Sequence, residues 1–128
     1  MSSERNYSVS ELRGISDARL DFFLQLHDKQ FEPLEERLRQ HPDQSDVLTV
    51  DQHDINESVS AVYEDFVATS NRMQELDLYF ATYDRAQPYF QPQLRNQIIA
   101  EMEETGAMIQ DLVRQVQELG RIDATVTQ

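Results

Sequence analysis

The chain has no cysteine and no tryptophan among its 128 residues, and it has only three glycines and four prolines. Without cysteine there can be no disulfide, no thiolate zinc site and no cysteine nucleophile. Few glycines and prolines leave few positions where a helix or strand has to stop. Long apolar runs are absent as well, since no stretch approaches the roughly 18 apolar residues of a membrane-spanning helix. The residues from Met1 to Arg5 also lack the hydrophobic region of a signal peptide.

Basic residues are scarce, and nearly all of them are arginine. The sequence has 24 acidic and 11 basic residues, a net charge of -13, and Lys29 is its single lysine. This charge repels phosphates and anionic lipid headgroups, so we expect no direct binding to nucleic acid or membranes. An acidic chain almost free of lysine resembles the proteins of extreme halophiles, although a GC-rich genome would also favour arginine. Residues 43–84 hold ten acids and one base, so the middle of the chain carries most of the charge.

Two segments carry apolar residues that alternate in steps of four and three, the heptad pattern of long helices with one narrow apolar face. The first stripe is Ile55, Val59, Val62, Phe66, Thr69, Met73, Leu76, Phe80 and Tyr83, and the second is Ile98, Met102, Thr105, Ile109, Leu112, Val116 and Leu119. We predict long helices over residues 47–86 and 92–119, joined by a turn at Pro88 and Pro92. Gly120 is the expected C-cap, and residues 120–128 the expected tail.

The two stripes should close on each other as an antiparallel hairpin whose paired positions sum to about 178. Phe80 then faces Met102 or Ile98, and each helix places one threonine, Thr69 or Thr105, in the seam. Such a threonine is accommodated when its hydroxyl bonds back to its own helix. Alternatively, the two threonines penalise slipped alignments and so fix the register.

The N-terminal third should supply a third, interrupted helix. Ser8 and Glu11 form a capping-box pattern, so a short helix is expected over residues 9–13, ended by Gly14. A second helix, over residues 17–40, should start at Ser16 and kink or break near Pro33. Its expected apolar stripe is Leu20, Leu24, His27, Phe31, Leu34 and Leu38, broadened by Phe23. The chain is thus predicted to be a single all-α domain, a three-helix bundle.

Apolar and aromatic positions outside the seam are candidates for a partner interface. Five of the eleven aromatic residues cluster around the hairpin turn, where a stiff convex end could present anchors to a partner. The alternative is that these aromatics only close the end of the bundle, with Phe80 and Tyr83 inside. A first helix broken at Pro33 cannot cover the whole second face of the hairpin, so self-association is expected. The candidate interface residues are Tyr79, Tyr89, Phe90, Tyr63, Val67, Ile99, Met108 and Val113.

Residues with metal-ligand chemistry are few. Asp51, His53, Asp54 and Glu57 form one cluster at the start of a long helix, but it lacks the three or four converging ligands of a zinc site. A solvated acidic helix start explains them, so no metal ligands and no cofactor are expected. His27 interrupts an apolar stripe, and it is either a hydrogen-bonded core histidine or a pH sensor.

No catalytic motif accompanies the helices, since no phosphate-binding glycine loop and no nucleophile elbow occurs. We therefore expect a non-enzymatic structural or adaptor protein in a homo-oligomer or larger assembly. A connector or tail protein of a tailed virus with a halophilic host fits the size and composition. The alternative is an acidic nucleic-acid mimic, similar to some anti-CRISPR proteins, that blocks a basic groove. The expected location is intracellular or virion-associated, without export by a signal peptide.

Overall fold

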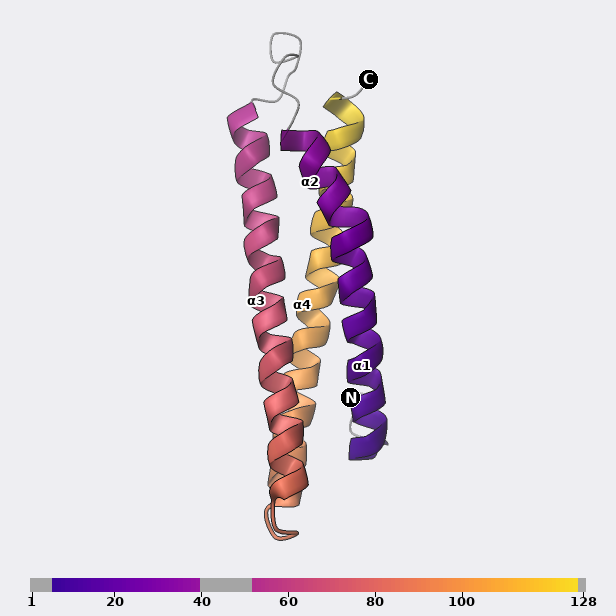
Figure 1. Cartoon of the computed structure of the whole chain (residues 1–128), viewed down its shortest axis with the longest axis vertical. Helices are drawn as coiled ribbons and strands as arrows, with labels where there is room; N and C mark the ends of the chain where they lie inside the picture. The colour runs from indigo at the N-terminus through magenta and orange to yellow at the C-terminus, as the bar shows by residue number, and fades with distance from the viewer. Residues whose placement is uncertain (1–5, 40–51, 127–128) are drawn as a thin grey trace. The chain divides into compact units, whose positions relative to one another are not determined.

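The computed structural model describes residues 6–39 and 52–126, and within these ranges every regular element is a helix (Figure 1). A long pair, α3 and α4, packs together with an N-terminal helix, which confirms the predicted all-α helical bundle. The elements in chain order are α1 (Val9–Gln25), the π-helix η2 (Leu26–Phe31), α2 (Glu32–Arg39), α3 (Gln52–Arg85) and α4 (Gln91–Val126).

The chain divides into two compact units, each assembled from segments that are far apart in sequence. Unit 1 comprises Met1–Phe23 and Ala68–Ile109, and unit 2 comprises Leu24–Val67 and Gln110–Gln128. Each unit has its own buried side chains. The single domain expected for residues 1–128 stays a prediction.

In unit 1, α1 packs against the end of the α3–α4 hairpin (Figure 1). Burial of one apolar side chain of this size contributes about 1.5–3 kcal/mol, so this shared cluster is the main stabilising feature of the unit. Its buried members are Leu12 from α1, Leu76 and Phe80 from α3, and Ile98, Ile99 and Met102 from α4. Phe80 shares this cluster with both partners that the hairpin register predicted for it.

Unit 2 is built from η2, α2, the first half of α3 and the second half of α4. The rings of Phe31 and Phe66 pack with centroids 4.8 Å apart. Polar contacts join the same helices, since the Gln52 side-chain amide donates to the Leu38 carbonyl oxygen at 3.0 Å. The buried apolar side chains of this unit are Leu26, Phe31, Leu34, Leu38, Ile55, Val59, Val62, Phe66, Leu112, Val116, Leu119 and Val126.

The heptad seam of the sequence is buried almost without exception. Every predicted seam position on α3 from Ile55 to Phe80, and every one on α4 from Ile98 to Leu119, is buried, while Tyr83 is half-buried. Thr105 Oγ donates to the carbonyl oxygen of Met102 at 3.2 Å, so its hydroxyl bonds back to its own helix as predicted. A role for the two threonines in fixing the register stays a prediction.

Helix α1 differs from the prediction because it does not stop at Gly14. The Ser8–Glu11 capping box is confirmed: the Ser8 amide donates to Glu11 Oε1, and the Glu11 amide donates to Ser8 Oγ, both at 3.1 Å. The helix then continues to Gln25, and no glycine in the described residues adopts a positive φ. Ser16, the predicted N-cap of a second helix, is buried in mid-helix instead. Burial of Leu12 and Phe23 on one continuous helix overrides the low helix propensity of glycine.

The predicted kink or break at Pro33 is replaced by a wide helical turn just before it. The amide of Glu32 donates to the carbonyl of His27, five residues earlier, which is the hydrogen bond of a π-helix. Proline lacks an amide and crowds the carbonyl four residues before it, and a widened turn accommodates both defects without breaking the helix.

The extra residue of the π turn also shifts the apolar stripe. Leu26 and Phe31 are five positions apart, and both are buried. Upstream, Phe23 is buried, whereas Leu20 and Leu24 are exposed. The predicted stripe through Leu20 and Leu24 was therefore wrong, because it assumed an unbroken heptad across this turn.

The ends of the long helices agree with the prediction at the turn and differ at the C-terminus. Pro92 lies in the first turn of α4, as predicted. The same helix passes through Gly120 to Val126, so neither the C-cap nor the tail at residues 120–128 was correct. A helical glycine costs about 1 kcal/mol relative to alanine, and burial of Val126 offsets this. The predicted start of α3 near residue 47 lies outside the described residues.

Candidate functional site

The turn between α3 and α4 is held by its own backbone. The Phe90 amide donates to the Gln87 carbonyl at 2.9 Å, the Gln91 amide donates to the Pro88 carbonyl at 3.3 Å, and the Ala86 amide donates to the Tyr83 carbonyl at 3.2 Å. Pro88 fixes one φ angle between these bonds. The result is a short, stiff connection with little conformational entropy left to lose on binding.

Two aromatic rings project from this turn into solvent. Tyr89 is 84% exposed and Phe90 is 51% exposed. The rings pack edge to face, with centroids 5.1 Å apart and an interplanar angle of 89°, so each limits the motion of the other. We call this pair the aromatic tip. Stiff, exposed aromatic side chains are the residues that protein interfaces use as anchors.

The helices below the aromatic tip are braced by an arginine from α1. Arg13 donates to both carboxylate oxygens of Asp84 on α3, at 2.8 and 3.0 Å. Its guanidinium carbon also lies 5.0 Å from the centroid of the buried Phe80 ring, a cation–π distance. The hydrogen bond from Arg13 lowers the pKa of Asp84, and the same bond raises the pKa of Arg13. This bidentate pair joins α1 to the last turn of α3 within unit 1.

A second brace in unit 1 connects the middle of α3 to α4. Arg72 Nη2 donates to Glu101 at 2.7 Å and to Glu104 at 2.6 Å. The hydrogen bond to Glu101, followed by the bond to Glu104, raises the pKa of Arg72. Arg72 also lies 3.7 Å from Glu75 on its own helix, so one cation holds three carboxylates.

The other predicted interface residues fall into three groups. Tyr63 and Val67 are exposed on α3, and Tyr79, Met108 and Val113 are half-buried. Ile99 was predicted wrongly as an interface residue, since it is 5% exposed and belongs to the core cluster of unit 1. Leu12 of α1 packs in that cluster, so the first helix covers more of this face than the sequence indicated.

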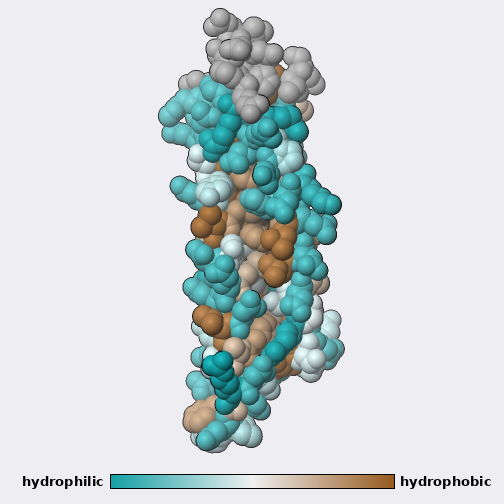
Figure 2. Space-filling view, in the orientation of Figure 1, coloured by the Kyte–Doolittle hydropathy of each residue, from teal (hydrophilic) through white to brown (hydrophobic). Residues whose placement is uncertain are grey.

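Other apolar side chains are exposed that the sequence did not single out. Leu78 is 68% exposed on α3, and Phe22 is 48% exposed on α1. On the face that Figure 2 draws, hydrophobic side chains interrupt the hydrophilic surface over both α3 and α1. Phe22 lies next to Phe23 on α1 but about 100° around the helix, and of the two only Phe23 is buried.

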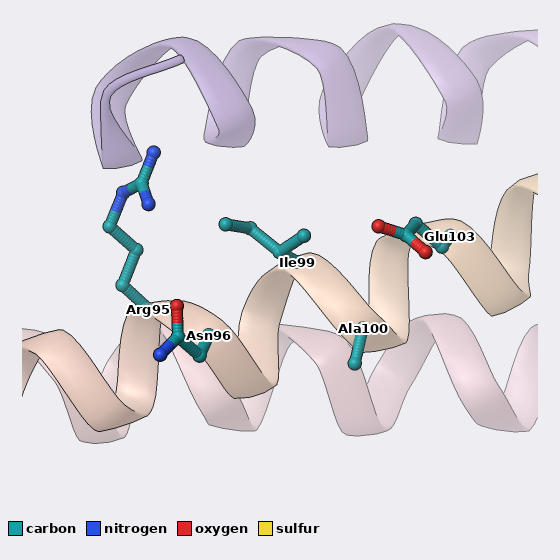
Figure 3. Close-up of a pocket in the computed structure, with 5 residues that line it drawn as sticks. All are labelled: Arg95, Asn96, Ile99, Ala100 and Glu103. Carbon is teal, nitrogen blue, oxygen red and sulfur yellow. The ribbon is translucent and has the colours of Figure 1, made fainter. Parts of the chain in front are cut away.

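Two hollows of unit 1 lie on single helices. A hollow of about 430 Å³ on α4 is lined by Arg95, Asn96, Ile99, Ala100 and Glu103 (Figure 3). The guanidinium of Arg95 already forms a hydrogen bond within the protein, since it donates to the carbonyl oxygen of Tyr7. A second hollow of about 250 Å³ on α3 has Glu75, Leu78, Tyr79 and Thr82 around it. Neither hollow brings together a nucleophile and a base.

The π turn gathers three potential metal ligands that the sequence did not reveal. His27, Asp28 and Glu32 place one ring nitrogen and two carboxylate oxygens within 4.8 Å of one another. In an α-helix, residues 27 and 32 would point in different directions. The His27 ring already lies 5.2 Å from the Phe66 ring, and its Nδ1 is 2.8 Å from Asp28 Oδ1. Three ligands from one turn leave much of a metal's coordination sphere to water, so we assign no metal here.

The cluster considered at the start of α3 is a surface pair. His53 Nε2 lies 3.1 Å from Glu57 Oε1, and both side chains are exposed. Asp51 lies outside the described residues.

No helix in the described part of the chain has the length and apolar character needed to cross a membrane. Comparison with known proteins gives no match: no family model, no curated protein and no solved structure matches this chain. The interpretation of the aromatic tip therefore depends on its geometry.

Proposed function

We propose that the protein is a non-enzymatic structural or adaptor protein that works in a homo-oligomer or a larger assembly. The observation that carries the proposal is the aromatic tip. Two rings that are half or more exposed cost free energy in water and gain it when a partner covers them, at about 25 cal/mol per Å² of apolar surface buried. Their turn is held by three backbone hydrogen bonds, which reduces the entropy lost on docking.

The bracing of the hairpin supports the same role. Arg13 joins α1 to Asp84, and Arg72 joins α3 to Glu101 and Glu104. Salt bridges this exposed contribute little stability, but as bidentate or multiple contacts they define geometry. A hairpin end with fixed geometry suits a component that must fit neighbours in an assembly.

A virion component of a tailed virus is the specific form of assembly that we propose. A single lysine beside a net charge of -13 favours a halophilic setting. In that setting, molar salt screens repulsion between acidic copies, because the Debye length falls to about 3 Å at 1 M. The location that follows is virion-associated, or intracellular before assembly.

The alternative, an acidic mimic that blocks a basic groove, needs carboxylates displayed in a dense row. On α3, Glu75 and Asp84 are engaged by Arg72 and Arg13, which reduces the charge offered to a partner. The structural role is therefore the better supported of the two.

Sedimentation velocity of the full chain at 0.1 M and 2 M NaCl tests the proposed homo-oligomer. The expected result is a species larger than a monomer, with its fraction increasing in high salt. A folded monomer at both salt concentrations would remove the homo-oligomer from the proposal. Sedimentation with added double-stranded DNA and a basic DNA-binding protein, in which this chain displaces the DNA, would support the mimic instead.

A further inference from the structure

The first half of α3 presents apolar and acidic side chains together. Tyr63 and Val67 lie one helical turn apart, and they are 48% and 43% exposed. Glu64, three residues before Val67, and Glu57, seven residues before Glu64, border them on the same side of the helix and are exposed. We call these four residues the acidic apolar face. It lies within unit 2.

The formal charge that α3 itself carries around this face is acidic. From Gln52 to Asn71 the sequence contains four carboxylates and no lysine or arginine. Arg39 of α2 donates to Ser60, on the same stretch of α3, at 3.3 Å. That arginine is itself paired with Glu35 at 3.4 Å. The face therefore offers two apolar anchors with an acidic border along one side.

We propose that the acidic apolar face docks a basic amphipathic helix of another protein; this deepens the proposed adaptor role and rests on it. Two apolar side chains one turn apart match the i and i+4 anchors of a helical ligand. The carboxylates at the border pair with lysines or arginines beside those anchors, which steers the encounter and fixes orientation. A second copy of this chain fits less well, because it would bring one acidic border against another.

A synthetic probe tests the charge and the anchors separately. The probe is a fluorescein-labelled, 15-residue helical peptide with leucines on one face and lysines on the others, and its control carries glutamate in place of each lysine. Anisotropy is measured in 0.1 M NaCl. The lysine peptide binds and the glutamate peptide does not, and binding weakens at 1 M NaCl because the border charges are screened.

Variants locate the binding site. The double substitution Tyr63→Ser with Val67→Ser is expected to raise the Kd by about tenfold or more, as loss of interface anchors does. The matched control is Leu78→Ser, which removes an exposed apolar residue elsewhere on the same helix and leaves the Kd unchanged. The charge variant Glu57→Gln with Glu64→Gln keeps the anchors and the fold, and it raises the Kd by about threefold at low salt only.

The proposal is overturned by a Kd that none of these substitutions changes, by an equal loss of affinity for Leu78→Ser, or by binding of the glutamate peptide. A fall in the native mass of Tyr63→Ser with Val67→Ser, without any change in peptide affinity, assigns the face to a second copy and also overturns it. The sedimentation experiment on the unmodified chain measures the oligomeric state, not the affinity for the peptide. If the chain sediments as a monomer, the proposed homo-oligomer is wrong. The docking proposal is then tested separately, by the Kd values of the peptide.

Discussion

Arg19 of α1 lies over Gly106 of α4. Arg19 Nη1 donates to the carbonyl oxygen of Met102 at 2.7 Å, and a Cβ at position 106 would lie 3.2 Å from Arg19 Nη2. The missing side chain of Gly106 thus leaves room for the guanidinium to reach the helix backbone. Both residues belong to unit 1, where this contact helps to place α1 on α4.

The substitution Gly106→Ala should therefore increase the free energy of unfolding by less than helix propensity predicts. Gly→Ala in a helix stabilises by about 0.5–1 kcal/mol, but here the new methyl group crowds the Arg19 guanidinium, which must shift by a few tenths of an ångström. We expect Gly106→Ala to leave the free energy of unfolding unchanged or lower in urea denaturation. In an Arg19→Ala background, the same substitution should recover its full gain.

The other two glycines provide the control. Nothing lies within 4 Å of a Cβ built at Gly14 or Gly120, and both residues are helical. Gly14→Ala and Gly120→Ala should each stabilise by about 0.5–1 kcal/mol. Equal gains at all three positions would show that Arg19 does not depend on Gly106.

The π turn is tested by two leucines that are two residues apart. Leu26 is 2% exposed and Leu24 is 46% exposed. Leu26→Ala should destabilise the protein by about 2–5 kcal/mol, whereas Leu24→Ala should cost less than about 1 kcal/mol. Denaturation of both variants in urea measures this. A larger destabilisation by Leu24→Ala than by Leu26→Ala would contradict the π turn and favour the unbroken heptad predicted from the sequence.

The Arg13–Asp84 pair should make stability depend on pH in the acid range. The pKa of Asp84 is lower in the folded protein than in the unfolded chain, where it is about 3.9. Ionised Asp84 therefore stabilises the fold above about pH 4, and this contribution is lost as the pH falls through the folded pKa. The stability difference between the native protein and Asp84→Asn should shrink below about pH 4.

Asp77→Asn is the matched control for that titration, since it removes another exposed carboxylate of α3. Its difference from the native protein should stay small throughout. A difference for Asp84→Asn that is constant from pH 7 to pH 2 would contradict the assignment.

Periodicity predicted the long helices well because their burial repeats every seven residues. The seam is uninterrupted from Ile55 to Phe80 and from Ile98 to Leu119, and the two prolines sufficed to predict the turn between the helices. The N-terminal third was predicted less well. Its pattern changes period at the π turn, and the helical state of Gly14 depends on packing of Leu12 rather than on local propensity.

In the candidate site, too, features set by local sequence were predictable and features set by packing were not. Exposure of Tyr89 and Phe90 was predictable from their place in a convex turn. Burial of Ile99 was not predictable, because it depends on where α1 lies against α4. The grouping of His27, Asp28 and Glu32 required the π turn, which no local sequence motif indicated.

We propose the aromatic tip as the assembly contact of this protein. The most direct measurement is the native mass of the full chain by light scattering, for the native protein, for Tyr89→Ser with Phe90→Ser, and for Phe22→Ser. Phe22 is a matched control because its ring is about as exposed as that of Phe90 but lies on α1. We expect an oligomer for the native protein and for Phe22→Ser, and a folded monomer for the tip variant. An unchanged mass in the tip variant, or a monomeric native protein, would contradict it.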